Sequence, residues 1–222
     1  MILVERVLVI VGAGAHGREV EDYLHDLPDA PRLLGFLDEH KPQGPMGDSQ
    51  VLGGFEAAAK LLGEFSEVLY VTAAGDNTVR RKLAAAAEEA GLKPYTVRHF
   101  RSVVGRDCEI GAGVCLAPNT VLTRAVTLGK HCIVNVGVTV SHDCTIRDFV
   151  NLNPGVTVCG DVEIGEDCYI GAGATIIDKV SIGANTVVGA GAVVIDELPG
   201  GVLAVGVPAR VVRELYPKPR LV

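Results

Sequence analysis

The chain has 222 residues, of which 48% are hydrophobic and only 5% aromatic, with no tryptophan. This length allows one or two domains, and the composition predicts a core of small aliphatic side chains. The net charge of −7 argues against nucleic-acid binding, because that affinity depends on basic surface. No apolar run approaches the roughly 20 residues that cross a membrane, and the short apolar segment 1–10 is interpreted as a strand rather than a signal peptide. We therefore expect a cytoplasmic protein without membrane insertion.

Residues 1–98 alternate between strand and helix patterns. The spacing of apolar residues predicts, in chain order, a strand at 6–11, a helix at 15–27, a strand at 33–37, a loop at 38–50, a helix at 55–62, a strand at 68–72, a helix at 77–90 and a strand at 93–98. Repeated strand–helix units indicate a parallel sheet covered by helices, an α/β domain of the Rossmann-like type.

The stretch VGAGAHGREV at 11–20 places Gly12, Gly14 and Gly17 in G-x-G-x-x-G spacing between a strand and a helix. Such glycines let the backbone approach a phosphate at a helix N-terminus, and the spacing is typical of dinucleotide binding. About 95 residues, however, provide one mononucleotide-binding half and not the two that hold a dinucleotide. We therefore expect a phosphate loop. The alternative is an NAD-linked oxidoreductase, which predicts NAD(H) binding by residues 1–98.

From Val104 the chain changes to a repeat of six residues. Every first position of sixteen consecutive hexads, from Val104 to Val194, is Val, Ile or Leu, and the fifth position is small or β-branched almost throughout. Each hexad predicts one short strand and a turn, so that three hexads close a triangular coil of about 18 residues and the coils stack as a parallel β-helix. The second position is often glycine, and we expect it to turn the chain at positive φ.

Six cysteines are present without a C-x-x-C pair, and Cys108, Cys132, Cys144 and Cys168 all occupy fifth hexad positions. Cysteines of one column lie two coils apart, beyond the roughly 7 Å between Cα atoms that a disulfide spans. We expect them to be small core residues that form neither a disulfide nor a metal site.

Several of these motifs together resemble one family. The hexads, NVGVTVSHDC at 135–144, the closing GVPAR at 206–210, GDN at 75–77 and the GAGAHG loop are similar to the NeuD/PglD-like sugar acetyltransferases, over nearly the whole chain. The resemblance implies a Rossmann-like nucleotide-sugar-binding domain over 1–98, then a left-handed parallel β-helix with a C-terminal capping segment over 99–222. It also implies a homotrimer, with acetyl-CoA between neighbouring β-helices and the nucleotide on the N-terminal domain.

The activity implied by the resemblance is acyl transfer. It is acetyl-CoA-dependent N-acetylation of the amine of a nucleotide-diphosphate-linked amino sugar, in surface glycan synthesis and without a metal. One alternative is an O-acetyltransferase acting on a sugar hydroxyl, as in the sialic-acid branch of the family. Another is a catalytically silent scaffold that uses the β-helix only to trimerise.

Acetyl transfer needs a base for the nucleophile's proton and a donor for the oxyanion. His142 lies third in its hexad on the turn side and matches the family's base, and Asp143 follows where it could orient the imidazole. One coil on from His142, the N–H of Gly160 is the expected oxyanion donor. Asn151 stands where the family can have a second histidine, so its amide is the expected donor to acetyl-CoA there.

The remaining contacts also come from the resemblance. Substrate binding is expected at Gly12, Gly14, His16, Gly17, Asp38, Glu39, Asn77 and Asn135, and cofactor binding at Asn151, Gly160, Gly206, Pro208 and Arg210. Structural alternatives stay open for several of these residues. They are Asp38 as a loop-forming aspartate, Asn77 as the N-cap of the helix that follows, Gly160 as a turn glycine serving the coil, Asn135 with Asn153 as an asparagine ladder, and the closing stretch as a cap on the solenoid. His131 and Arg124 are expected to be solvated turn residues.

Overall fold

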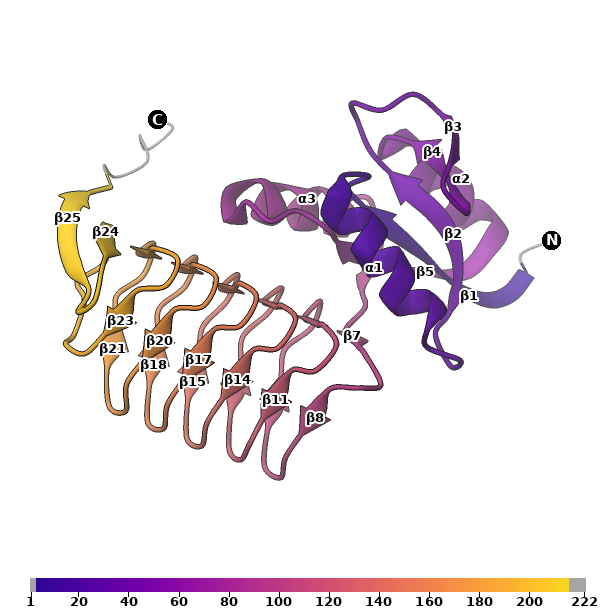
Figure 1. Ribbon diagram of the computed structural model, residues 1–222. Coiled ribbons are helices and arrows are strands. Elements are labelled where there is room, and N and C mark those ends of the chain that lie inside the picture. Colours follow the sequence, from indigo (N-terminus) through magenta and orange to yellow (C-terminus); the bar gives the residue numbers. More distant parts are fainter. Residues whose placement is uncertain (1–2, 216–222) are drawn as a thin grey trace. The chain divides into compact units, whose positions relative to one another are not determined.

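The computed structural model describes residues 3–215 and divides into two compact units, Met1–Phe100 and Arg101–Val222 (Figure 1). This division falls two residues beyond the expected one at 98/99. Residues 1–2 and 216–222, which the expected domains include, lie outside the described residues. Among residues 3–215, no helix is both long and apolar enough to span a bilayer.

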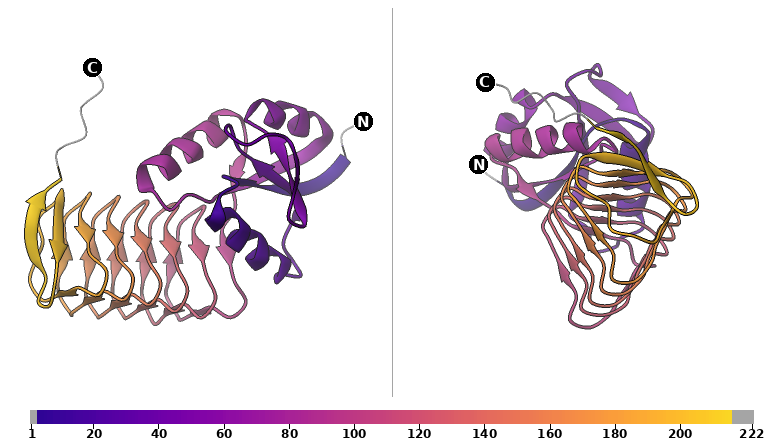
Figure 2. Two further views of the ribbon diagram at one scale, coloured as in Figure 1. Left: turned by 45° about the horizontal axis from the view of Figure 1, so that its top comes forward. Right: turned by 90° about the vertical axis from the view of Figure 1, so that its left-hand side faces the viewer.

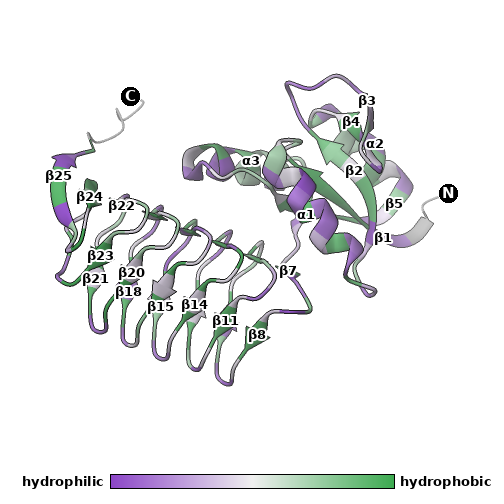
Figure 3. Ribbon diagram, viewed as in Figure 1, coloured by the Kyte–Doolittle hydropathy of each residue, from purple (hydrophilic) through white to green (hydrophobic). Residues whose placement is uncertain are grey.

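The N-terminal unit is a sheet of mainly parallel strands with three helices. Its elements are β1 (Leu3–Val11), α1 (Ala15–His25), β2 (Arg32–Leu37), β3 (Gly44–Met46), β4 (Ser49–Gly53), α2 (Glu56–Glu64), β5 (Phe65–Thr72), α3 (Asn77–Glu89), β6 (Lys93–Pro94) and β7 (Val97–Arg98). The sheet runs in the order β3-β4-β2-β1-β5-β6, and β1 pairs in parallel with both β2 and β5. Hydrophobic segments gather in the middle of the sheet (Figure 3). Residues 7–11 of β1 are almost fully buried, as expected of a central strand covered on both faces. The predicted strand–helix alternation is confirmed, except that the single strand expected at 93–98 is two short strands, β6 in this sheet and β7 outside it.

Residues 38–50 are more ordered than expected. The segment contains β3 and the start of β4, which form an antiparallel hairpin with Gly47 at φ 62° in its turn. Strand β4 also extends the main sheet, because Phe36 of β2 pairs in parallel with Val51. The expectation of a loop was wrong. Pro45 and the many turn-forming residues hid the hairpin, and a proline is tolerated there because β3 is an edge strand.

The order of the sheet places a topological switch point at β1. After β1 the chain adds β2, β3 and β4 on one side of β1, and it then returns to add β5 and β6 on the other side. In open α/β sheets a crevice forms at the carboxyl ends of the strands at such a point, and ligands bind there.

The C-terminal unit is a left-handed parallel β-helix built from two-residue strands. Face 1 contains β10 (Cys115–Leu116), β13 (Ile133–Val134), β16 (Asn151–Leu152), β19 (Tyr169–Ile170), β22 (Val187–Val188), β24 (Val202–Val205) and β25 (Arg210–Glu214). Face 2 contains β8 (Val103–Val104), β11 (Val121–Leu122), β14 (Thr139–Val140), β17 (Thr157–Val158), β20 (Thr175–Ile176) and β23 (Val193–Val194). Face 3 contains β9 (Glu109–Ile110), β12 (Thr127–Leu128), β15 (Thr145–Ile146), β18 (Glu163–Ile164) and β21 (Ser181–Ile182).

Stacked coils are in register at the predicted interval. Thr127 pairs with Thr145 and Leu128 with Ile146, a separation of 18 residues that recurs on all three faces. Viewed along the solenoid, the coils superpose with a roughly triangular outline (Figure 2). First- and fifth-position side chains fill the interior, and all except Val104, Cys108 and Ile110 of the first coil are buried. The predicted fold class is confirmed.

The cysteines at fifth positions serve the core. All six cysteines are free thiols. The thiols of Cys132, Cys144 and Cys168 each donate to the carbonyl oxygen of the residue fifteen positions on, at 3.0, 3.0 and 3.1 Å. This recurrent contact lets a small, weakly polar side chain satisfy its S–H inside the solenoid.

Positive φ occurs at the fourth hexad position and not at the second. Asp143 has φ 58° and Asn185 φ 61°, both in the left-handed region that Asp and Asn tolerate. The second-position glycines serve a different purpose: a Cβ on Gly165 would lie 2.5 Å from the Ala184 backbone nitrogen in the next coil. The expectation of positive φ at these glycines was therefore wrong. They are glycines because consecutive coils approach too closely for a side chain.

The last segment closes the solenoid. Strand β24 pairs in parallel with β22, and β25 returns antiparallel to β24, with Val202 opposite Glu214. The loop between them is tied to the final hexad, since Val193 donates to the Gly206 carbonyl and accepts from the Ala209 N–H. The closing stretch therefore caps the last coil.

Candidate functional site

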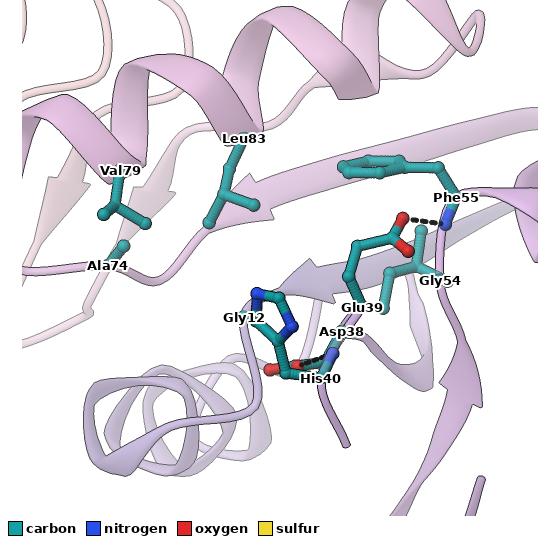
Figure 4. A pocket seen from close by; sticks show the side chains of 10 residues that line it. Gly12, Asp38, Glu39, His40, Gly54, Phe55, Ala74, Val79 and Leu83 are labelled. Carbon is teal, nitrogen blue, oxygen red and sulfur yellow. Dashed lines mark hydrogen bonds between the residues drawn. The ribbon is translucent and has the colours of Figure 1, made fainter. Parts of the chain in front are cut away.

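The N-terminal unit has a pocket at its switch point (Figure 4). It encloses about 190 Å³, and its wall comes from the carboxyl ends of β1, β2, β4 and β5 and from the first two turns of α3. The lining residues are Gly12, Leu37, Asp38, Glu39, His40, Gly54, Phe55, Ala74, Val79 and Leu83. The mix of apolar side chains with a few polar groups suits a flat heterocycle with polar edges.

The Asp38 carboxylate is occupied by the main chain. Its Oδ2 accepts the Ala13 N–H at 2.8 Å, and its Oδ1 accepts the N–H groups of His40 and Lys41 at 2.9 and 3.1 Å. Burial acts to raise the pKa of Asp38, but these three hydrogen bonds outweigh it, and the pKa lies below its ordinary value. Asp38 thus fixes the GAGAHG loop to the end of β2, which fits the loop-forming alternative.

Glu39 is partly engaged in a similar way. Its Oε1 accepts the Phe55 N–H at 2.9 Å, while its Oε2 lies against Gly54, where a Cβ would approach it to 2.5 Å (Figure 4). The Gly54 N–H in turn donates to Glu56 Oε1 at 2.9 Å. Glu39 thereby joins the loop after β2 to the start of α2 while its carboxylate lines the pocket.

The three glycines of the GAGAHG loop differ in their surroundings. Gly12 has φ 108°, and a Cβ there would lie 3.1 Å from the Ala73 carbonyl oxygen. A Cβ on Gly17 would collide with the Gly12 carbonyl oxygen, so this glycine allows α1 to pack against the loop. Gly14, the N-cap of α1, has open space where its Cβ would be. Of the three glycines, Gly14 is the one that could carry a Cβ without contacting the surrounding protein. A glycine at such a position is expected where a ligand approaches the backbone closely.

His16 lies in the first turn of α1. Its Nδ1 is 3.0 Å from Glu19 Oε2, whereas its Nε2 is buried and has no hydrogen-bond partner among the described residues. Buried polar atoms are nearly always paired, so the Nε2 atom needs a water molecule or ligand.

Helix α3 begins differently from expectation. Its N-cap is Asp76, whose carboxylate accepts the Val79 N–H at 2.9 Å, and Asn77 is the first helical residue. The suggestion that Asn77 caps the helix was wrong, because the acceptor one residue earlier has the extended backbone that a cap requires. Asn77 Oδ1 instead accepts from the buried Arg80 at 2.9 Å, and Arg80 also donates to the Ala74 carbonyl.

In the solenoid, His142 occupies the exposed turn between faces 2 and 3. Its Nδ1 lies 2.9 Å from Asp143 Oδ2. An Nδ1–H···carboxylate hydrogen bond leaves Nε2 as the free lone pair, which is the arrangement that a general base needs. The Asp143 carboxylate is thus within hydrogen-bond distance of the imidazole that the sequence predicts it to orient.

Gly160 lies directly under this imidazole, one coil along. A Cβ on Gly160 would be 2.6 Å from His142 Cε1 and 2.7 Å from His142 Nε2. The Gly160 N–H donates to no acceptor within residues 3–215. An open donor therefore lies beside the lone pair of the candidate base, which suits an oxyanion formed next to it.

Asp161 is a neighbour that sequence reasoning missed. One nitrogen of His142 and one carboxylate oxygen each of Asp143 and Asp161 lie within 4.8 Å of one another. The period of the repeat contained the clue, because adding 18 to 143 gives 161, just as adding 18 to 142 gives 160.

Two other candidates lie elsewhere on the solenoid. Asn135 is in the turn between faces 1 and 2, where its Oδ1 accepts the Val136 N–H, and Asn151 is a buried residue of β16 on face 1. Neither shares the turn of His142. His131 is not a solvated turn residue as expected: it is buried and stacks on Phe149, with ring centroids 5.0 Å apart. Arg124 is exposed and pairs with Asp107 at 3.0 Å.

The expected CoA contacts of the closing stretch lie in the cap. Gly206 and Pro208 form the loop between β24 and β25, and Arg210 opens β25 with its guanidinium 3.3 Å from Asp196 Oδ2. A single chain thus groups its candidate residues into separate places: the switch-point pocket, the His142 turn, face 1 with its adjoining turn, and the cap.

Comparisons with known proteins give separate matches for the two units. A family model described as the PglD N-terminal domain matches residues 7–87, and one described as bacterial transferase hexapeptide (six repeats) matches 143–178 and 161–196. A crystal structure of a histidine-to-asparagine variant of perosamine N-acetyltransferase from Caulobacter crescentus, with CoA and GDP-perosamine, is similar at a TM-score of 0.88 and 31% identity. That match covers 94% of this chain and 97% of the other.

Two curated relatives are similar over shorter stretches. GDP-perosamine N-acetyltransferase from Escherichia coli O157:H7 is 29% identical over 148 residues, which are 64% of this chain. UDP-N-acetylbacillosamine N-acetyltransferase from Bacillus subtilis (strain 168) is 33% identical over 112 residues, or 49% of this chain. The matched regions span 64% and 50% of these relatives' own lengths.

Proposed function

The chain belongs to the NeuD/PglD-like family of sugar acetyltransferases, and we propose that it N-acetylates the amine of a nucleotide-diphosphate-linked amino sugar with acetyl-CoA as donor. The observation that carries this proposal is the His142–Asp143 pair beside Gly160, on a solenoid that follows the domain with the switch-point pocket in the chain. The relatives named for such substrates support the sugar class. Surface glycan synthesis is the process this reaction would serve.

The mechanism we propose is direct attack. His142 Nε2 accepts a proton from the sugar nitrogen as that nitrogen attacks the thioester carbon of acetyl-CoA, and Asp143 stabilises the imidazolium. The Gly160 N–H donates to the developing oxyanion, and collapse of the tetrahedral intermediate breaks the C–S bond and releases CoA. No covalent enzyme intermediate is needed.

The nucleotide half of the substrate fits the switch-point pocket. Leu37, Phe55, Val79 and Leu83 would hold the base, and Glu39 would meet its polar edge. The open space at Gly14 and the unpartnered Nε2 of His16 would meet the diphosphate at the N-terminus of α1. Asn77 is a further substrate contact implied by the family, whereas Asp38 would act through the loop that it fixes.

An assembly of three chains would explain the scattered candidates. Asn135 and Asn151 lie away from His142 in one chain, so they could reach the same substrates only from a neighbouring copy. A homotrimer with acetyl-CoA between adjacent solenoids would also give the Gly206–Pro208 loop and Arg210 a place beside the cofactor. We propose this assembly and a cytoplasmic location, where acetyl-CoA and sugar nucleotides are made.

The NAD-linked alternative receives no support from the pocket. An acidic residue after β2 would have to bind a ribose, and Asp38 has both oxygens occupied by three backbone N–H groups. O-acetylation remains chemically possible with the same base and cofactor.

The decisive experiment is acetyl transfer from acetyl-CoA to a panel of UDP-, GDP- and dTDP-linked amino sugars and to matched hydroxyl acceptors. We expect transfer to an amine, and we expect His142→Ala to lower turnover by at least 100-fold while the circular dichroism spectrum is unchanged. Transfer only to hydroxyls would support the O-acetyltransferase. The absence of acetyl-CoA binding by calorimetry would support a silent scaffold.

A further inference from the structure

Asp161 adds a second carboxylate to the His142–Asp143 pair. It comes from the next coil, and its N–H donates to the His142 carbonyl oxygen at 3.0 Å, which fixes its backbone relative to the base. Its φ of 57° belongs to the fourth hexad position, where Asp or Asn is tolerated without strain. Asp161 is exposed, and its carboxylate forms no hydrogen bond or ion pair within residues 3–215.

We propose that Asp161 is a specificity-determining residue, which together with Asp143 binds the acceptor's amino group as an ammonium ion and so favours amines over hydroxyls. The inference rests on the proposed N-acetyltransferase function and deepens it. A base alone serves either acceptor, because His142 can take a proton from nitrogen or from oxygen. A second carboxylate beside His142 attracts an acceptor that binds as an ammonium ion, and it gives no such attraction to a neutral hydroxyl group.

The ammonium ion must lose one proton before its nitrogen can attack. A primary amine is mostly protonated at neutral pH and has no lone pair for attack until one proton has left. We infer that this first proton passes through the Asp161 carboxylate to solvent. The neutral amine then attacks, the C–N bond forms, and the second proton moves to His142 Nε2 as the C–S bond breaks. His142 returns that proton to the CoA thiolate, so one amide, one thiol and one released proton result.

The turn that holds the Asp143 and Asp161 carboxylates carries a net negative charge. Arg124 lies one coil before His142, and its guanidinium is taken by Asp107 at 3.0 Å. Lys179 lies one coil beyond Asp161 and forms no ion pair with it in the part of the chain that the structure describes. Asp178, the third-position residue one coil after Gly160, adds a further acidic group to this corner.

The other titratable groups nearby are thiols. Cys144 donates its S–H to the Cys159 carbonyl oxygen at 3.0 Å, and burial raises the pKa of the Cys144 thiol. Cys144 is therefore neutral and does not offset the carboxylates. The carboxylate pair faces solvent beside the lone pair of His142, where a cationic amine can reach it.

The test compares Asp161→Asn with a matched control, Asp167→Asn. Both aspartates occupy the fourth hexad position with φ near 60°, so neither substitution strains the backbone, and Asp167 lies in the turn between faces 3 and 1, away from the turn of His142. Each full-length variant is assayed with acetyl-CoA and the amino-sugar nucleotide that the wild type accepts, with kcat and KM measured between pH 6 and pH 9.

We expect Asp161→Asn to raise KM for the amino sugar about five- to tenfold at pH 6.5, with KM for acetyl-CoA unchanged. The rise should shrink towards pH 9, where the free amine predominates and the charge matters less. A lost structural contact would instead change KM equally at every pH. Asp167→Asn should match the wild type throughout.

An unchanged KM for the amino sugar in Asp161→Asn at every pH would overturn the inference, as would a pH-independent rise. Loss of wild-type activity on chelation, restored by a divalent cation, would also overturn it, since the three side chains would then hold a metal. If the wild type transfers acetyl to no amino sugar at all, the proposed function fails first. Wild-type transfer with an unaffected Asp161→Asn variant rejects only the role of Asp161.

Discussion

The imidazole of His142 rests on Gly160, so closely that a methyl group on Gly160 would lie 2.6 Å from His142 Cε1. The two residues are 18 positions apart and belong to consecutive coils. A base and a backbone donor are thereby held side by side by the repeat itself. The relationship leaves no room for a side chain at position 160.

The first prediction follows from this contact. Gly160→Ala should displace the imidazole and lower kcat/KM by about 100-fold, because misplacing a catalytic group by 1 Å costs about that much. Steady-state kinetics measure the effect, and thermal unfolding should stay near the wild-type midpoint because the His142 ring is exposed and can swing away. Ala172→Ser, an exposed substitution at the same hexad position, is the control. Wild-type kinetics in Gly160→Ala would contradict the assigned geometry.

A second prediction separates two glycines of the phosphate loop. Gly17→Ala should destabilise the protein by about 1–3 kcal/mol, because its Cβ collides with the Gly12 carbonyl oxygen. Gly14→Ala should leave stability nearly unchanged, because open space surrounds its Cβ, yet weaken nucleotide-sugar binding by blocking approach to the backbone. Urea denaturation and calorimetric titration with the sugar nucleotide measure the two effects. Equal sugar-nucleotide binding by Gly14→Ala and wild type would contradict a phosphate-binding role for this loop.

A third prediction concerns Asp38 and pH. Its pKa is depressed in the folded state, so it stabilises the fold above its unfolded value of about 3.9, and this contribution is lost as pH falls through the lower folded value. Asp38→Asn keeps a single acceptor oxygen for three N–H groups, and we expect a loss of about 1–3 kcal/mol at pH 7.

Denaturation of wild type and variant at pH 7 and pH 3 tests this. The difference between the two proteins should shrink at the lower pH, because the Asp38 carboxyl group of the unfolded wild-type chain is largely protonated at pH 3, which stabilises the unfolded state relative to the folded one. A difference that stays constant across this range would mean that the charge of Asp38 makes no contribution.

A fourth prediction concerns thiol reactivity. Burial raises the pKa of Cys168 to about 12, and the nearby Asp167 adds to this effect. At pH 8 its thiolate fraction is then roughly a thousand times smaller than that of an ordinary cysteine, so alkylation should be correspondingly slow in the native protein. Cys108 and Cys159, which are partly exposed, should react first. Mass spectrometry of alkylated peptides before and after unfolding measures the order, and equal labelling in the native state would contradict the buried placement.

The solenoid was largely readable from sequence, and the N-terminal unit less so. A period of six with an aliphatic first position fixes which side chains point inward, and the structure places them there from Leu116 onwards. The β3–β4 hairpin had no comparable pattern, since its strands are short and lie among turn-forming residues. Its pairing with β2 depends on a strand more than ten residues away, which local spacing does not reveal.

The repeat period by itself determined that His142 and Gly160 are axial neighbours, because residues one coil apart stack wherever the register is unbroken. The same arithmetic contained Asp161. Only the tertiary structure decided that the Asp38 carboxylate accepts three main-chain N–H groups, that His131 is buried against Phe149, and that second-position glycines are required because consecutive coils stack closely. The period shows that His131 and Phe149 are axial neighbours, and it does the same for each second-position glycine and the next coil, but it does not give the interatomic distances that decide hydrogen bonds and steric contacts.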